Sequence, residues 1–268
     1  MHHGLAVDIA LLLTGVLAGA ASAAFGIGGA VITTPMIRLF GETAFLAVAT
    51  PLPSILPTAA AGALRYHKRD LIVWQIVMRV GPPGAIGAAL ASLAPRRLPG
   101  DGHPLMILTA MLLGWTAWRT LNAGDGRPNV EIGTPGNNAA VTSPVARIRL
   151  YVIGFAVGAL AGLLGIGGGA LLVPALRRKV GLPIKQAVAT SLACVAVFTL
   201  PAITVHAIER DIDWPIALLL CGGVIPGARI GSNLAMRASD PGLQRAVGRF
   251  FIVLAIIYGV TETYQWVH

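Results

Sequence analysis

Apolar runs long enough to cross a lipid bilayer follow one another along almost the whole chain, and this feature limits the fold more than any other. Inside a bilayer every backbone N–H and C=O group needs a partner within the protein, so each run is expected to form a helix. The sequence shows none of the short alternating segments of a membrane β-barrel. It therefore predicts an all-α polytopic membrane protein with eight spans, at residues 5–25, 44–64, 71–93, 104–121, 150–164, 184–206, 214–236 and 246–266.

The composition agrees with this class of protein. Of the 268 residues, 55% are hydrophobic and 12% are charged, whereas about 25% of the residues in soluble proteins are charged. The net charge of +9 is carried by short basic clusters between the apolar runs. This pattern is typical of loops that face anionic lipid, so we expect membrane lipid but no nucleic acid among the partners.

Two glycine-rich phrases in the chain are nearly identical. "GIGGAVITTPMI" covers residues 26–37, and "GIGGGALLVPAL" covers residues 165–176. The apolar pieces that follow the glycines, at residues 30–40 and 170–176, are too short to cross a membrane alone. We interpret each piece as a half-helix that continues from a glycine break, in a discontinuous or re-entrant helix.

The glycine phrases belong to a duplication of the chain. The "AVAT" of residues 47–50 recurs at residues 187–190, Trp74 matches Trp214, and "PGAIGAALA" at residues 83–91 resembles "PGARIGSNLA" at residues 226–235. We predict two tandem homologous repeats, residues 1–121 and 148–268, joined by a polar linker at residues 122–147. Breaks at corresponding places in two repeats indicate the binding site of a transporter.

The relative orientation of the two repeats is left open by the sequence. Eight full crossings would make the repeats parallel, and an extra crossing in each broken segment would invert them. With eight crossings, the basic clusters at residues 65–69 and 177–179 fall on opposite sides of the membrane. The distribution of charge therefore gives only a weak preference for both termini outside.

The glycine breaks could form an anion-binding site. Glycine lets the backbone leave helical geometry, and a half-helix that begins at such a break has free N–H groups and a dipole that favour an anion. The alternative is that glycine merely allows close helix packing, which we prefer for Gly227 and Gly231. The candidate substrate-binding residues are the glycines of the two phrases with polar residues in or near the duplicated blocks: Gly26, Gly28, Gly29, Thr33, Thr50, Gly165, Gly167, Gly168, Gly169, Thr190, Ser191, Ser232 and Asn233.

Charged residues inside the apolar runs are the remaining candidates. Arg79 and Arg229 lie in predicted spans, where a charge is costly unless it faces water, a partner or a ligand, and an anion path would use them. No carboxylate lies deep in any predicted span, which argues against a cation transporter and against a metal enzyme. We therefore expect a small anionic substrate, no catalytic residues, no metal and no cofactor.

The duplicated "GIGGG…P" phrase with its "AVATS" block resembles the TauE/SafE family of sulfite exporters and sulfonate permeases. The second half carries the fuller version, whereas the first half has Ala30 where the third glycine stands and Pro51 where the serine stands. The resemblance covers nearly the whole chain apart from the linker. It implies an inner-membrane secondary transporter of sulfite, an organosulfonate or another small sulfur-containing oxyanion. The resemblance does not fix the direction of transport, because the family includes exporters and importers, and we expect export. An anion channel and an import permease for another small organic anion are the alternatives, and no oligomeric state is predicted.

Overall fold

The computed structural model describes residues 5–39, 43–93, 103–121 and 144–267, and all regular elements in these residues are helices. Each predicted span falls on helical residues, although the span 44–64 is divided between two helices, and the two short apolar pieces coincide with α2 and α9. In chain order the elements are α1 (Leu5–Phe25), α2 (Ala30–Leu39), α3 (Ala44–Ala49), α4 (Leu52–His67), α5 (Trp74–Ser92), α6 (His103–Leu121), α8 (Pro144–Leu164), α9 (Gly169–Ala175), the π-helical segment η2 (Leu176–Val180), α10 (Ile184–Ile208), α11 (Trp214–Arg237) and α12 (Asp240–Val267).

The surface of the bundle is that of a membrane protein. Six helical stretches in the described part of the chain are long and apolar enough to span a bilayer. Large apolar side chains such as Leu17, Met78 and Leu218 are about two-thirds exposed on the outside of the bundle. A soluble monomer rarely exposes so much contiguous apolar surface. The chain is a multi-pass membrane protein, as the apolar runs predict.

The helix boundaries follow from local sequence. Asp213 caps α11 by accepting a hydrogen bond from the Ile216 N–H at 3.2 Å, and Pro215 stands in the first turn, where its missing N–H costs nothing. Pro51 and Pro53 lie where the predicted span 44–64 divides into α3 and α4. The second half has Ser191 in place of Pro51, and α10 continues through it unbroken.

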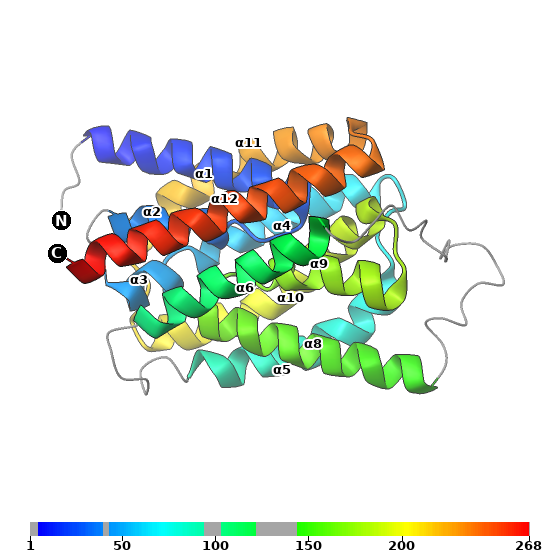
Figure 1. Ribbon diagram of the computed structural model, residues 1–268. Coiled ribbons are helices and arrows are strands. Elements are labelled where there is room, and N and C mark those ends of the chain that lie inside the picture. The colour runs from blue at the N-terminus through cyan, green and yellow to red at the C-terminus, as the bar shows by residue number, and fades with distance from the viewer. Residues whose placement is uncertain (1–4, 40–42, 94–102, 122–143, 268) are drawn as a thin grey trace.

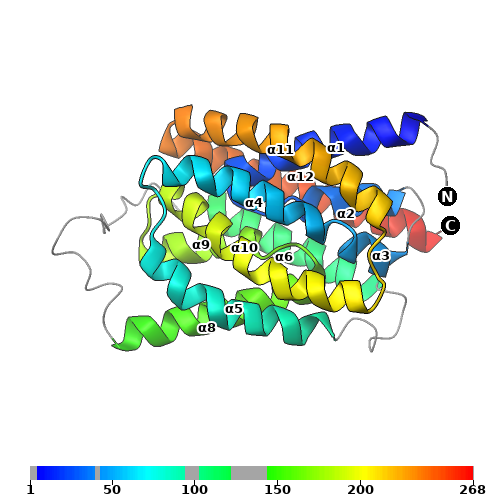
Figure 2. The same cartoon turned by 180° about the vertical axis from the view of Figure 1, so that it is seen from behind.

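The helices run in directions that the sequence left open. Figures 1 and 2 show that α1 and α8 are antiparallel, and that α12 ends at the same end of the bundle at which α1 begins. We call this the terminal end, and we call the opposite end, where α6 ends and α8 begins, the linker end. In both views α2 turns back toward the terminal end, and α9 with η2 turns back toward the linker end. Each glycine break therefore lies at the tip of a helical hairpin inside the bundle.

Two pairs of helices pack with their backbones in close contact, α1 with α11 and α5 with α8. Gly227 and Gly231 of α11 lie against the backbone of Val16 and Ala20 in α1, so close that an added Cβ would overlap the carbonyl oxygens there. The interpretation of this glycine pair as a packing motif is confirmed. Small residues let helices approach in lipid, where van der Waals contact drives association.

The predicted linker at residues 122–147 is described only in its last four residues. Residues 122–143 lie outside the described residues, and residues 144–147 form the first turn of α8. The span predicted at 150–164 therefore belongs to a longer helix. Arg147 and Arg149 interrupt the apolar run, although they are compatible with the exposed end of a helix.

Candidate functional site

The two glycine segments, residues 26–29 and 165–168, leave helical geometry through left-handed residues. Gly26 and Gly28 have φ values of 71° and 79°, and Gly165, Gly167 and Gly168 have values of 64°, 72° and 74°. Side chains make this region of φ costly, and a β-branched residue is a clear outlier there. Glycine is therefore required for the chain to turn at these points.

The two glycine segments meet at the centre of the bundle. A Cβ added to Gly28 would lie 3.5 Å from the Cα of Gly167 and 3.1 Å from the carbonyl oxygen of Ile166. A Cβ added to Gly169 would overlap the carbonyl oxygen of Gly26. The two hairpins enter from opposite ends of the bundle (Figures 1 and 2), and their tips pack backbone against backbone.

The carbonyl group of Gly26 is contacted by the two second-half residues at which the halves differ in sequence, Gly169 and Ser191. The Ser191 hydroxyl donates a hydrogen bond to this oxygen at 2.9 Å, and Gly169 packs against it without a side chain. At the corresponding positions the first half has Pro51, which has no hydroxyl, and Ala30, which has a Cβ. The two glycine segments are therefore unequal in their surroundings, as the sequence indicates.

Each glycine segment rests on the "AVAT" block of the other half of the chain. A Cβ on Gly26 would lie 3.0 Å from the Cα of Val188, and one on Gly165 would lie 2.6 Å from the carbonyl oxygen of Val48. Val48 and Val188 occupy the same position in the two copies of the block. The duplicated motifs are thus brought together crosswise.

Thr50 and Thr190 form a second crosswise pair of contacts. The Thr50 hydroxyl accepts a hydrogen bond from the Asp213 N–H at 3.1 Å, and the Thr190 hydroxyl accepts one from the Val73 N–H, also at 3.1 Å. Asp213 and Val73 precede the matching tryptophans at the start of α11 and α5. Both hydroxyls therefore hold the first turn of a helix from the other half.

Removing either hydroxyl should destabilise the protein. We expect Thr50→Val and Thr190→Val to lower the free energy of unfolding by about 1–3 kcal/mol, the cost of leaving a buried polar group without its partner. Thr50→Ser and Thr190→Ser keep the hydroxyl and should retain most of the stability. Thermal unfolding of the purified variants in detergent measures the difference. Valine variants as stable as the serine variants would show that these hydrogen bonds do not matter.

The other predicted polar residues bond within the protein. The Thr33 hydroxyl lies 3.3 Å from the Gly29 carbonyl oxygen, one turn earlier, and the Ser232 hydroxyl lies 2.8 Å from that of Ala228. Asn233 accepts a hydrogen bond from Arg65 of α4. The structure thus places Thr33 beside a glycine segment, whereas Ser232 and Asn233 belong to the packing of α11.

The two candidate arginines differ in position. Arg79 is half-buried in the second turn of α5, whereas Arg229 is exposed on the outside of α11. The glycine hairpins pack inside the bundle, so the structure does not bring the Arg229 side chain to them.

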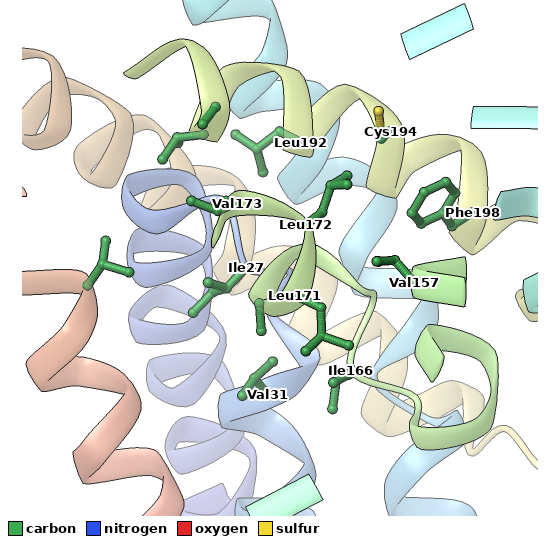
Figure 3. Packing of buried hydrophobic residues seen from close by; sticks show 14 of the residues in the cluster. Ile27, Val31, Val157, Ile166, Leu171, Leu172, Val173, Leu192, Cys194 and Phe198 are labelled. Atoms are coloured by element: carbon green, nitrogen blue, oxygen red, sulfur yellow. The ribbon is translucent and has the colours of Figure 1, made fainter. Parts of the chain in front are cut away.

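Apolar side chains surround the meeting point of the glycine segments. Ile27 and Ile166 are buried, and Figure 3 shows both with Leu171 in one cluster of buried residues. Ile55 of α4 and Val195 of α10 also reach the glycines and would lie 3.0 Å and 3.6 Å from a Cβ on Gly167. The sequence analysis did not identify Ile55 and Val195. The alignment of the two "AVAT" blocks could have done so, because each residue lies five positions after the matched threonine of its block.

One group of metal-binding side chains lies elsewhere in the described residues. His206, Glu209 and Asp211 place ligand atoms within 4.8 Å of one another at the turn between α10 and α11. The Nδ1 atom of His206 lies 3.3 Å from the Asp211 carboxylate, and the Asp211 N–H bonds to the His206 carbonyl oxygen at 3.0 Å. These contacts join His206 and Asp211 across the turn at the terminal end. The expectation of no metal stays a prediction.

Comparison with known proteins agrees with the resemblance to the TauE/SafE family. The family model described as Sulfite exporter TauE/SafE matches residues 11–258. A "Probable membrane transporter protein" of Xylella fastidiosa (strain 9a5c) is 30% identical over 248 residues, covering 91% of each chain. The "Probable membrane transporter protein YunE" of Bacillus subtilis (strain 168) is 25% identical over 271 residues, covering 96% of this chain and 97% of the relative. No solved structure matches the chain.

Proposed function

This chain belongs to the TauE/SafE sulfite exporter family, a family of membrane transporters, and from this premise we propose that it exports a small sulfur-containing oxyanion across the inner membrane. Sulfite or an organosulfonate is the substrate, and alternating access is the mechanism. The observation that carries the proposal is the contact between Gly28 and Gly167 at the centre of the bundle. A site where two hairpins meet from opposite ends is accessible in turn from either side when one half moves.

We infer that the two halves are inverted repeats. The antiparallel course of α1 and α8 supports this (Figure 1), as does the crosswise packing of α1 with α11 and of α8 with α5. The matching hydrogen bonds of Thr50 and Thr190 add a third reason. In such transporters the substrate site lies at the interface of the repeats, near the middle of the membrane.

The substrate anion would bind where the glycine segments turn. The backbone N–H groups at the start of α2 and α9 have no partner within their own helices, and the helix dipoles make both ends positive. Gly28, Gly29, Gly167, Gly168 and Gly169 would supply these amides without a side chain in the way. Arg79 would add positive charge from α5, and Ser191 would add a hydroxyl beside Gly26.

The described conformation is closed at this point. The space beside Gly167, between Leu52, Phe198 and Thr199, is too small to admit a water molecule. A substrate therefore needs the halves to separate by a small movement before it can enter. This closed contact is compatible with alternating access, in which the site opens to one side at a time, whereas an open channel would need a continuous path.

The distribution of charge supports an orientation with both termini outside. Basic residues gather at the linker end, where α4 and α6 end, η2 lies and α8 begins (Figures 1 and 2). The clusters at residues 65–69 and 177–179, which eight full crossings would separate, share this end because each glycine hairpin turns the chain back. By the positive-inside rule the linker end faces the cytoplasm.

Flux measured in proteoliposomes tests the proposal. The purified protein is reconstituted, and uptake of labelled sulfite is followed with and without a pH gradient, in competition with sulfate, thiosulfate and a small sulfonate. We expect saturable sulfite flux that a sulfonate reduces. Folded protein with no flux above that of empty liposomes would exclude sulfite as the substrate. Single-channel currents in a planar bilayer would show that the protein is an anion channel and not a transporter.

A further inference from the structure

A crevice lies between α6 and α8 on the outside of the bundle, with α9 and η2 as its floor. Helices α6, α8 and α9 are neighbours in Figures 1 and 2. The volume of the crevice, about 450 Å³, lies within the range of roughly 300–1,000 Å³ that is usual for small-molecule sites. Trp115 of α6 and Val152 of α8 line it and are 48% and 61% exposed. The crevice therefore opens toward the hydrocarbon of the membrane.

Three cations line this otherwise largely apolar crevice. Arg119 stands in the last turn of α6, and Arg178 and Lys179 belong to η2. Both elements reach the linker end of the bundle (Figure 1), and all three cationic side chains line the crevice there. The Arg119 guanidinium lies 4.3 Å from the centre of the Trp115 ring, which favours a fixed position for it. None of the described residues that line the crevice is acidic.

The cationic mouth does not follow from the duplication. At the shift of 139 residues that aligns the glycine phrases, Arg178 corresponds to Leu39 of α2, an exposed apolar residue. The corresponding helices of the other half, α1 and α12, are joined by the rings of Phe25 and Phe250, whose centres are 5.0 Å apart. The charge is therefore a property of this crevice and not of the shared fold.

We propose that the crevice binds an anionic phospholipid. The phosphate lies between Arg119, Arg178 and Lys179, and an acyl chain lies along the apolar lining between α6 and α8. Basic pockets between membrane helices on the cytoplasmic side bind anionic headgroups in this way. The linker end carries most of the basic residues, so the mouth lies at the leaflet in which anionic lipids are enriched.

Lipid binding to the purified protein tests this proposal. The delipidated protein in neutral detergent is titrated with phosphatidylglycerol or phosphatidylcholine of identical acyl chains, and bound lipid is counted by native mass spectrometry. We expect the wild type to bind phosphatidylglycerol at least tenfold more tightly. The double variant R178Q/K179Q should lose this preference. The matched control R147Q/R149Q removes the same charge from exposed positions at the same end and should keep it.

Two further measurements separate a lipid from other ligands. Ala156→Phe fills the crevice from α8 without changing its charge, and it should weaken binding of phosphatidylglycerol at least tenfold. Glycerol phosphate, which has the headgroup charge but no acyl chain, should not bind. The proposal is overturned if R178Q/K179Q keeps the preference, if both double variants lose it equally, or if glycerol phosphate binds as tightly as the lipid. None of these results depends on which anion is transported.

Discussion

Gly169→Ala should abolish transport while the protein still inserts into the membrane. The added Cβ would overlap the Gly26 carbonyl oxygen and lie 2.8 Å from the Cα of Ile27, and these backbone atoms are held in place by Ser191 and by the left-handed turn at Gly26. An extra methyl group in a packed core typically destabilises a protein by about 1–3 kcal/mol. At Gly169 the resulting strain would disturb the contact between the two hairpins, which must open and close during transport. Sulfite flux in proteoliposomes, normalised to the amount of inserted protein, measures the loss.

The first half of the chain supplies the matched control. Ala30 corresponds to Gly169 and already carries a Cβ in a fully buried position. We expect Ala30→Gly to retain most of the flux, because it creates no overlap. A second variant, Gly168→Val, places a β-branched residue at φ 74° and should also be inactive. Normal flux through Gly169→Ala would remove the glycine contact from the mechanism.

Gly223→Ala should destabilise the protein strongly, whereas the same change at the neighbouring Gly222 should not. A Cβ on Gly223 would overlap the Leu12 carbonyl oxygen and lie 3.0 Å from the Cα of Gly15, so α1 and α11 would have to separate. We expect a loss of about 1–3 kcal/mol in the free energy of unfolding. No atom lies within 4 Å of a Cβ on Gly222, and alanine there improves helix propensity by about 1 kcal/mol.

Thermal unfolding of the two variants in the same detergent gives the comparison. The two positions are adjacent in α11, so differences in expression, insertion or detergent binding affect both alike. The pair α5–α8 offers an independent repetition, because a Cβ on Gly158 would overlap the Gly84 carbonyl oxygen in the same manner. If Gly223→Ala is as stable as Gly222→Ala, close backbone contact does not hold these helices together.

The prediction from sequence succeeded where the signal was local. Long apolar runs leave helix as the only option in a bilayer, so the helices at residues 5–25 and 214–237 agree with prediction to within one residue. The division of the span 44–64 into α3 and α4 was missed, although Pro51 and Pro53 mark the place. The start of α8 was also missed, because its first turns carry Arg147 and Arg149 and fall outside an apolar window.

Only part of the candidate site could be predicted from the sequence. The glycines identified the turning points because glycine adopts left-handed φ more readily than residues with a side chain. The partners of Thr50, Thr190 and Asn233 were not identified, because each lies in the other half of the chain, more than 100 residues away. Sequence patterns describe neighbours along the chain, whereas these hydrogen bonds depend on how the two halves interlock.

The sequence by itself determined the class of the protein, most of its helices and the positions of its two glycine turns, since these follow from hydrophobicity and backbone sterics within a short window. That the repeated motifs reflect a duplication stays a prediction. Only the tertiary structure decided that α1 and α8 are antiparallel and that Gly28 meets Gly167 (Figures 1 and 2). It also decided that the basic residues of α4 and η2 share one end. The physical reason is that a glycine break can continue a helix or reverse it, and the packing of the hairpin against helices of the other half selects the reversal.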